Sequence, residues 1–402
     1  MSERLIIIGA GQAGAQAVQS LRSDGFGGPI TLIGDEAYAP YQRPPLSKAY
    51  LLGTFARERL FLKPDTFYRE SDCSLILNTR VRAIHRAEKT VELPDGQRLP
   101  YDKLLLTTGT RVRELTCPGA DLAGVHYLRS IADVDGLQAH FRPGARLAIV
   151  GGGYIGLEVA AVAAKRGLDV TVFEAMDRLM ARAVSVPMSE FFAAEHEKAG
   201  VILKLRTGVE AIAGQGKVER VRAGGHNYAA DIMLVGIGVL PNDELALQSG
   251  LFCEDGIVVN RSGMTEDPSI FAAGDCTRHI GREGNAIRLE CVQNAIDQAK
   301  HCALAISGKP ATYSEVPWFW SDQYDLKLQI AGLARSGDRI VLRGDPAARK
   351  FAVFHLRDGI VAAVEAVNAA PEYLAARKWI AAGARIAPEK LADLSVPLKQ
   401  MT

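Results

Sequence analysis

The chain has 402 residues, of which 47 are Lys or Arg and 46 are Asp or Glu. This length predicts roughly two to four domains. The formal net charge of +1 excludes a general electrostatic attraction to nucleic acid or to anionic membranes, and no apolar stretch is long enough for a transmembrane helix. The six cysteines are scattered and form no C-x-x-C motif, so we expect a reducing, cytoplasmic location and no metal site.

The N-terminal segment predicts a strand, a turn, a helix and a second strand. The apolar run at residues 4–8 ends in the sequence Gly9-Ala10-Gly11-Gln12-Ala13-Gly14. We expect a helix over 15–23 and a strand over 29–34, which leads directly into Asp35. A G-x-G-x-x-G turn between strand and helix, followed at this distance by an acid, is the dinucleotide-binding fingerprint.

Each glycine of such a fingerprint has a separate physical role. The first (Gly9) permits a tight turn, the second (Gly11) lets backbone N–H groups approach a pyrophosphate, and the third (Gly14) packs helix against strand. The acid, Asp35, accepts hydrogen bonds from ribose hydroxyls. A glycine-rich turn with a purely structural role is the alternative interpretation of such a motif.

The same pattern recurs about 140 residues later. A predicted strand over 147–150 leads into Gly151-Gly152-Gly153-Tyr154-Ile155-Gly156, and we expect a helix over 157–166. The next strand, over 170–173, ends at Glu174. In this copy, Gly151, Gly153, Ile155 and Gly156 form the predicted phosphate turn.

Two copies predict two bound dinucleotides. The Glu174 carboxylate would repel a 2′-phosphate, so the second site is expected to prefer NADH to NADPH. Arg178 and Arg182 weaken this preference, because a nearby arginine can accept a phosphate.

Three further apolar strands support the same layout, over residues 104–109, 232–238 and 270–275. The last ends in Asp275, where a carboxylate emerges from the sheet beside a glycine. A helix N-cap or turn role for this residue is the alternative to ligand binding.

Together these motifs resemble the glutathione-reductase-like flavoproteins, and most closely the ferredoxin reductases of bacterial oxygenase systems. The most specific segments are Pro44–Lys48, Gly151–Glu158, Gly274–Cys276, Trp318–Tyr324 and Ser395–Lys399.

The resemblance implies an α/β fold with two Rossmann-like dinucleotide-binding domains and a C-terminal α+β domain. The expected ranges are 1–115 and 246–314 for an FAD-binding domain, 116–245 for an NADH-binding domain, and 315–402 for the C-terminal domain. In the last we expect strands over 350–356 and 359–368, and a helix over 371–382 with a proline in its first turn.

The same resemblance assigns further residues to the cofactors. Those expected at FAD, beside the first glycine turn, are Ala13, Asp35, Lys48, Val81, Arg129, Asp275, Val292 and Trp320. Val292 would begin a helix whose positive end stabilises the charge of reduced flavin.

Three residues are expected to act in hydride transfer. In the family Lys48 lies beside flavin N5 and pairs with Glu158, whereas most lysines in such a position are simply solvated. Tyr154 would cover the flavin face and move aside for the nicotinamide.

Trp318 and Trp320 would shield the flavin, or serve only as a domain-interface anchor.

The cysteine positions exclude the thiol-dependent branches of this superfamily. Disulfide reductases carry a C-x4-C motif soon after the first fingerprint, but the first cysteine here is Cys73. Electrons from NADH therefore have no thiol to reach, and the flavin must reduce an external acceptor.

The expected acceptor is a [2Fe-2S] ferredoxin that supplies an oxygenase, which could be a haem-thiolate monooxygenase. Lys300, Arg377 and Lys399 are candidate docking residues, because such ferredoxins are acidic. The protein is expected to be a monomer or weak dimer without a nucleic-acid or membrane partner. Alternatives are a rubredoxin, quinone or monodehydroascorbate reductase, and a redox-gated interaction protein like apoptosis-inducing factor.

Overall fold

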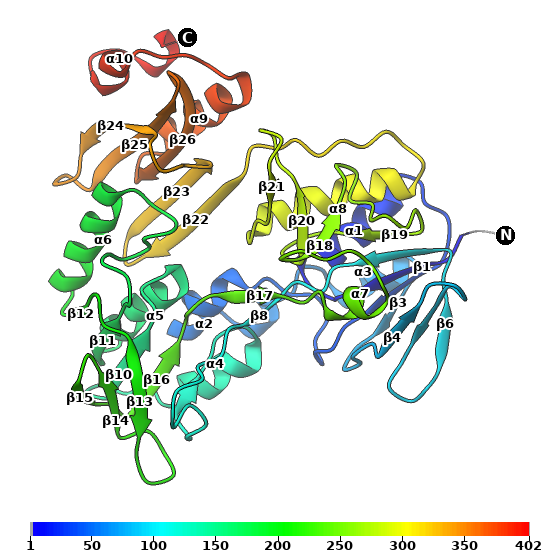
Figure 1. Cartoon of the computed structure of the whole chain (residues 1–402), viewed down its shortest axis with the longest axis horizontal. Helices are drawn as coiled ribbons and strands as arrows, with labels where there is room; N and C mark the ends of the chain where they lie inside the picture. Colours follow the sequence, from blue (N-terminus) through cyan, green and yellow to red (C-terminus); the bar gives the residue numbers. More distant parts are fainter. Residues whose placement is uncertain (1–2, 402) are drawn as a thin grey trace. The chain divides into compact units, whose positions relative to one another are not determined.

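The computed structural model describes residues 3–401, which divide into two compact units (Figure 1). Unit 1 comprises the chain through Gln42, Arg57–Arg111 and Leu240–Glu315. Unit 2 comprises Arg43–Ala56, Val112–Val239 and the chain from Val316 onward. Unit 1 thus lacks residues 43–56 and 112–115 of the predicted FAD-binding domain and gains residues 240–245 of the predicted NADH-binding domain. Unit 2 combines most of the predicted NADH-binding domain with the predicted C-terminal domain. The three-domain division itself stays a prediction.

Unit 1 is built on a five-stranded parallel sheet in the order β19-β7-β1-β2-β3. Its strands are β1 (Leu5–Ile8), β2 (Ile30–Ile33), β3 (Cys73–Ile76), β7 (Lys103–Leu106) and β19 (Ile270–Ala272). Its helices are α1 (Gln12–Ser23), η2 (Arg57–Leu60), α3 (Asp65–Glu70), α7 (Glu244–Gln248) and α8 (Val292–Ile306). Two small sheets complete it: β4 (Ala83–His85), β5 (Thr90–Glu92) and β6 (Arg98–Pro100), and β18 (Ile257–Val259), β20 (Thr277–Ile280) and β21 (Ala286–Ile287).

Alternate residues of β1 enter two different cores. Leu5 and Ile7 pack with apolar residues of α1 and α8, whereas Ile6 and Ile8 pack with residues of the small sheet β4-β5-β6. A strand covered on both faces must be apolar throughout, which explains the unbroken run Leu5–Ile8. This packing aligns the carboxyl ends of β1, β2 and β7 at one edge of the sheet.

Unit 2 repeats this plan with a parallel sheet in the order β12-β11-β10-β16-β9. Its strands are β9 (Val125–His126), β10 (Arg146–Val150), β11 (Asp169–Phe173), β12 (Ile202–Lys204) and β16 (Ile232–Val235), with an antiparallel sheet of β13 (Val209–Ala213), β14 (Arg220–Ala223) and β15 (His226–Ala229). Its helical segments are η1 (Pro44–Ser47), α2 (Ala49–Leu52), α4 (Ile131–Gln138), α5 (Tyr154–Lys165) and α6 (Val186–Lys198). The chain passes between the units at five points, two of which lie within β8 (Thr110–Val112) and β17 (Val239–Pro241).

The C-terminal part of unit 2 is an antiparallel sheet in the order β22-β23-β26-β25-β24. Its elements are β22 (Trp318–Gln323), β23 (Leu326–Gly332), β24 (Arg339–Asp345), β25 (Lys350–Arg357), β26 (Ile360–Val367), α9 (Ala370–Ala382), α10 (Pro388–Ala392) and η3 (Leu398–Gln400). Phe192 of α6 shares a core with Leu328 and Phe351 of this sheet. That common core explains why the two parts form one compact unit.

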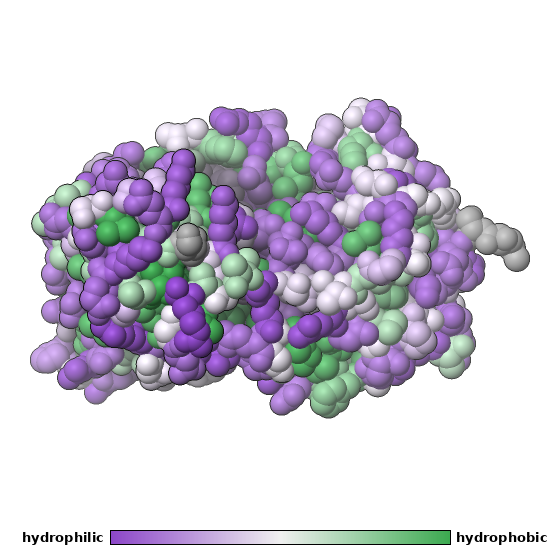
Figure 2. All heavy atoms as spheres, turned by 90° about the horizontal axis from the view of Figure 1, so that it is seen from above, coloured by the Kyte–Doolittle hydropathy of each residue, from purple (hydrophilic) through white to green (hydrophobic). Residues whose placement is uncertain are grey.

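The predicted elements are confirmed, with ends shifted by a few residues. The two fingerprint helices begin three residues earlier than expected, at Gln12 and at Tyr154. The strands β7, β16 and β19 end three residues earlier than expected. The predicted C-terminal helix is α9, and it carries Pro371 in its first turn. Within residues 3–401 no helix is long and apolar enough to cross a membrane. The face drawn in Figure 2 is mainly hydrophilic, and its apolar areas are small and scattered.

Candidate functional site

The first glycine turn shows the three roles expected of a fingerprint. Gly9 has a φ of +118°, and a Cβ there would lie 2.1 Å from the carbonyl oxygen of Thr107. A Cβ on Gly14 would lie 2.2 Å from the carbonyl oxygen of Gly9. A Cβ on Gly11 would meet nothing within 4 Å. The fold therefore requires the first and third glycines, and the second leaves open space at the start of α1.

The second glycine turn is built in the same way. Gly151 has a φ of +101°, with a Cβ position 2.3 Å from the carbonyl oxygen of Gly236, and a Cβ on Gly156 would lie 2.3 Å from the carbonyl oxygen of Gly151. Gly153 again has nothing within 4 Å of its Cβ position. Ile155 follows it and is exposed, on the first turn of α5.

The helices that follow these turns have free N-termini. Neither α1 nor α5 has a side-chain cap, and neither carries an acid in its first turn. By contrast, α4 is closed by a capping box between Ser130 and Asp133. Unsatisfied N–H groups with partial positive charge suit a pyrophosphate, so the two turns fit FAD and NADH.

The two acids after the second strands differ. Asp35 is exposed and its carboxylate makes no hydrogen bond among residues 3–401. Glu174 accepts backbone N–H groups of Gly152 and Met176, each at 2.7 Å. A carboxylate has about four acceptor sites, so Glu174 can still receive ribose hydroxyls. Both acids thus remain predicted ribose partners.

Of the two arginines that could accept a 2′-phosphate, Arg178 is already engaged. Its guanidinium donates to the carbonyl oxygens of Val184 and Ala181, at 2.8 and 2.6 Å. This arrangement supports the expected preference for NADH.

Several predicted FAD residues of unit 1 lie near the first glycine turn. Ala13 is buried on α1, and its Cβ is 3.4 Å from the Cβ position of Gly274, which precedes Asp275. Thr110 Oγ1 lies 3.5 Å from a carboxylate oxygen of Asp275. Val292 begins α8 as predicted, and Val81 lies half-buried in the segment between β3 and β4.

A partly buried ion pair joins Lys48 and Glu158 within unit 2. Lys48 Nζ lies 2.6 Å from Glu158 Oε2, and the two side chains are 18% and 4% exposed. Two further acceptors lie near the ammonium, the carbonyl oxygen of Pro44 at 3.2 Å and Ser47 Oγ at 3.4 Å. The position of Lys48 between η1 and α2 is therefore fixed by three contacts, which excludes the simple solvated lysine.

Two serines complete the shell around Glu158, and neither was predicted. Ser47 Oγ donates to Oε2 at 2.5 Å, and Ser321 Oγ donates to Oε1 at 2.6 Å. Both lie in segments singled out by the family resemblance, Pro44–Lys48 and Trp318–Tyr324. The sequence contained one sign of these roles: in each segment a serine stands directly beside a charged or aromatic residue, Lys48 or Trp320.

Aromatic residues of β22 lie beside Tyr154 at the start of α5. The rings of Tyr154 and Phe319 have centroids 4.5 Å apart. Burial, together with the nearby carboxylates of Glu365 and Glu158, raises the pKa of the Tyr154 phenol, so it stays protonated. Trp320 is half-buried, with its ring centroid 5.6 Å from that of Trp318. Tyr154 is thus part of an aromatic cluster.

The predicted docking residues and Arg129 have different surroundings. Lys300 is exposed on α8 and pairs with Asp297 at 3.2 Å. Arg377 stacks over Trp318, with its guanidinium carbon 5.3 Å from the ring centroid, and Lys399 is exposed in η3. Lys300 belongs to unit 1 and the other two to unit 2. A docking surface shared by the three stays a prediction. Arg129, also in unit 2, lies directly before the N-cap of α4.

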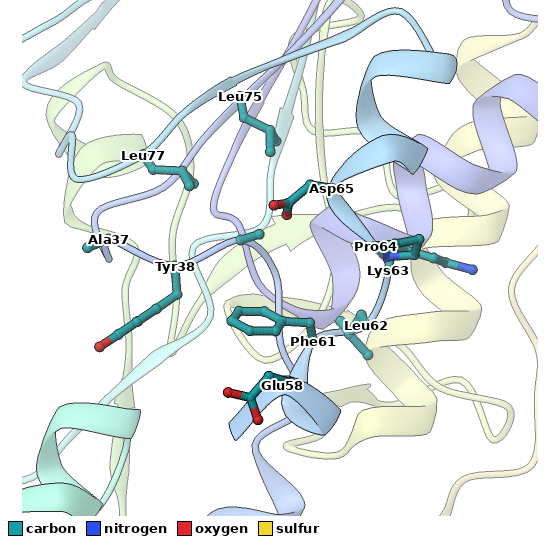
Figure 3. Close-up of a pocket in the computed structure, with 11 residues that line it drawn as sticks. Ala37, Tyr38, Glu58, Phe61, Leu62, Lys63, Pro64, Asp65, Leu75 and Leu77 are labelled. Carbon is teal, nitrogen blue, oxygen red and sulfur yellow. The ribbon is translucent and has the colours of Figure 1, made fainter. Parts of the chain in front are cut away.

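Unit 1 also contains a pocket of 640 Å³ (Figure 3). Tyr38, Phe61 and Glu58 line one part of it, and the Lys63 ammonium points away from them. Leu77 follows β3, so the pocket continues the carboxyl edge of the sheet beyond Asp35. None of the predicted FAD residues lines it, and the glycine turns are better evidence for the cofactor.

The cysteines offer no reactive thiolate. All six are free, and burial raises the pKa of every thiol, to about 12 for Cys73 and to about 11 for Cys291. Since the thiolate is the reactive form, the raised pKa values make these thiols less reactive. Among residues 3–401 no cluster of His, Cys, Asp or Glu could hold a metal ion.

Comparison with known proteins agrees with this site. Residues 3–299 match the model of the pyridine nucleotide-disulphide oxidoreductase family, and residues 318–402 match the reductase C-terminal family. The chain is 46% identical over 398 residues to rhodocoxin reductase of Rhodococcus erythropolis, covering 98% of this chain and 93% of that protein. It is 43% identical over 402 residues to the ferredoxin reductase subunit of 5,5′-dehydrodivanillate O-demethylase from a Sphingobium species, covering 99% and 98%.

The fold agrees with a solved structure of the same group. Putidaredoxin reductase, in its covalent complex with putidaredoxin, superposes with a TM-score of 0.97 at 38% identity, covering 99% of this chain and 98% of that one. The chain therefore belongs to the pyridine nucleotide-disulphide oxidoreductase family, and within it to the FAD- and NAD(P)H-dependent ferredoxin reductases of bacterial oxygenase systems.

Proposed function

We propose that this protein takes hydride from NADH and passes single electrons to a [2Fe-2S] ferredoxin that supplies an oxygenase. The observation that carries the proposal is the ion pair of the partly buried Lys48 with the buried Glu158, in a chain that has two uncapped glycine turns and no reactive thiolate. Burying a carboxylate is costly and an ion pair with it is of little use for stability, so a functional role is favoured.

Each predicted residue has a physical task in this function. The N–H groups at Gly11 and Gly153 bind the two pyrophosphates, and Asp35 and Glu174 orient the two riboses. Bound FAD supplies the exchange between two-electron and one-electron transfer. Lys48 holds a positive charge where the family places flavin N5, and Glu158 keeps that charge compensated. Tyr154 excludes water from the hydride-accepting face until the nicotinamide replaces it.

The preference for NADH rests on Glu174 and on the engagement of Arg178 by carbonyl oxygens. The acidic ferredoxin is expected to bind at Lys300, Arg377 or Lys399, and Trp320 is expected to shield the flavin from solvent. We further propose a cytoplasmic monomer or weak dimer, because the free thiols suit a reducing compartment.

Anaerobic mixing experiments test this function. NADH should bleach the flavin absorbance of the FAD-loaded enzyme, and a [2Fe-2S] ferredoxin should then reoxidise it faster than rubredoxin, quinones or disulfides do. If a quinone or a rubredoxin reoxidises the flavin faster than the ferredoxin does, that compound or protein is the acceptor and the ferredoxin assignment is wrong. Rapid reduction followed by slow turnover with every acceptor would indicate a redox-gated interaction protein instead.

A further inference from the structure

The hydrogen-bond shell of Glu158 continues beyond Ser321 into the interior of unit 2. Ser321 Oγ lies 3.2 Å from Gln323 Nε2, and Gln323 Oε1 lies 2.8 Å from Nε2 of His196. The other ring nitrogen of His196, Nδ1, lies 2.9 Å from the hydroxyl of Tyr324. Five side chains thus form one continuous series of hydrogen bonds. They come from α5, from α6, from β22 and from Tyr324, which directly follows β22.

Elementary hydrogen-bond chemistry fixes the direction of every bond in this series. The Glu158 carboxylate only accepts, so Ser321 must donate its single proton to it. The Ser321 oxygen then accepts from the Gln323 amide, whose own oxygen accepts from His196. A neutral imidazole has one donor and one acceptor, so Nδ1 of His196 accepts from the Tyr324 hydroxyl. All four donors point towards Glu158.

Burial supports this arrangement. Ser321 and His196 are 0% exposed and Gln323 is 1% exposed, so none of them can exchange its partner for water. Burial also lowers the pKa of His196 to about 4, which keeps the ring neutral as the series requires. Bonds that point one way polarise one another and strengthen the last acceptor contact.

The strand geometry of β22 explains why its sequence contains these residues. Ser321 and Gln323 are two positions apart, so their side chains point to the same face, whereas Asp322 between them is exposed on the other. A buried serine and glutamine in a strand are costly unless they are hydrogen-bonded. The Trp318–Tyr324 segment therefore contains polar residues with a task separate from that of its tryptophans.

We propose that Ser321, Gln323 and His196 are positioning residues that hold the Glu158 carboxylate in register with Lys48. Ser321 occupies Oε1, which leaves Oε2 to Lys48 and Ser47. Without this donor, Oε1 would be an unsatisfied buried oxygen and would compete for the ammonium of Lys48. The inference rests on the proposed function, because it takes Lys48 to act beside the flavin.

The test uses the FAD-loaded full chain with NADH and no ferredoxin. Ser321→Ala should lower the limiting rate of flavin reduction by about tenfold, as for loss of one hydrogen bond to a charged group, with an unchanged NADH dissociation constant. Gln323→Leu, one link further away, should have a smaller effect. Ser321→Thr keeps the hydroxyl and should restore the rate.

Two spectroscopic measurements test the hydrogen-bonded series from Glu158 to Tyr324 without a catalytic readout. Infrared difference spectra should show that the carboxylate band of Glu158, identified by its loss in Glu158→Gln, shifts in Ser321→Ala and not in Ser321→Thr. Nitrogen NMR of the imidazole should find His196 as the neutral tautomer with hydrogen on Nε2. Asp322→Asn, on the opposite face of the same strand, is the matched control and should change nothing.

The proposal is overturned if folded, FAD-loaded Ser321→Ala keeps the wild-type rate and carboxylate band, or if His196 carries its hydrogen on Nδ1. Equal losses in Ser321→Ala and Ser321→Thr would also overturn it, since they would indicate a packing effect. Failure to find a ferredoxin acceptor would refute the proposed function alone, because none of these measurements contains ferredoxin.

Discussion

The two glycine turns are built alike, but the acids beside them are held differently. In both turns the first glycine has a positive φ, the third is in contact with the carbonyl oxygen of the first, and the second faces open space. Glu174 is fixed by two backbone N–H groups, whereas Asp35 is exposed without a partner among residues 3–401. The comparison shows that packing determines the turn, whereas no contact among these residues holds Asp35, and its role at a ribose stays a prediction.

The strongest test of the shared architecture is to add a methyl group to each turn. Gly14→Ala and Gly156→Ala place a Cβ within 2.3 Å of a carbonyl oxygen, so each should lower the free energy of unfolding by about 3 kcal/mol or more. Gly11→Ala and Gly153→Ala meet no atom and should keep stability while weakening cofactor binding. Urea unfolding of the four variants measures this, and a stable Gly156→Ala protein would contradict it.

Each unit also contains a buried histidine whose pKa is strongly lowered, which makes acid stability a second comparison. Burial lowers the pKa of His196 in unit 2 and of His279 in unit 1 to about 4. The unfolded chain takes up these protons near pH 6.5, so stability is complete above that pH and falls as the pH drops towards 4. The loss should be about 1.4 kcal/mol per pH unit for each histidine.

Unfolding measured between pH 7 and pH 4.5 tests this, with His279→Gln and His196→Gln as the comparison. Each variant should have a shallower pH dependence than the wild type. An unchanged slope in both variants would show that carboxylates, and not these histidines, govern the acid response.

The difference between the two acids predicts different consequences of removing them. Glu174→Ala should weaken NADH binding by about tenfold and also lower stability by about 1 kcal/mol, because two N–H groups lose their acceptor. Asp35→Ala should weaken FAD retention and leave the stability of the apoprotein unchanged. Equilibrium titration and thermal unfolding separate the two effects. Full NADH affinity in Glu174→Ala would refute the ribose assignment.

The smallest expected effect concerns the choice between NADH and NADPH. Arg178 donates to two carbonyl oxygens, so Arg178→Ala should change the ratio of the two dissociation constants by less than about twofold. A large gain of discrimination in this variant would mean that Arg178 leaves its carbonyl partners to bind a 2′-phosphate. Arg182→Ala provides the parallel measurement for the second arginine.

The sequence was sufficient for both glycine turns and for the strands and helices that flank them, because these depend on local signals, whereas most of the smaller strands and helices were not predicted. The run Leu5–Ile8 is apolar on both faces, and the positive φ of Gly9 and Gly151 leaves few alternatives to glycine. The pairing of Lys48 with Glu158 was predicted from the family resemblance alone. No local pattern indicates it, because the two residues are 110 positions apart in the chain.

Other parts of the site could not be predicted, since they depend on tertiary contacts without a local pattern. Ser47 and Ser321 are ordinary serines in the sequence, and His196 resembles any histidine on a helix. Their roles arise only because α5, α6 and β22 pack together. The grouping of residues 43–56 with unit 2 likewise follows from contacts with α5 and α4 that no periodicity indicates.

The shell around Glu158 has a consequence for how the protein is made. Its three donors come from residues 110, 111 and 163 positions away, so the carboxylate cannot be fully satisfied until β22 has been synthesised. Contacts between such distant segments close a long loop and form late in folding. On the ribosome, a chain that ends before Trp318 would carry both glycine turns but lack the Ser321 hydroxyl. Completion of the C-terminal sheet is thus the step at which a nascent chain acquires its finished charge pair.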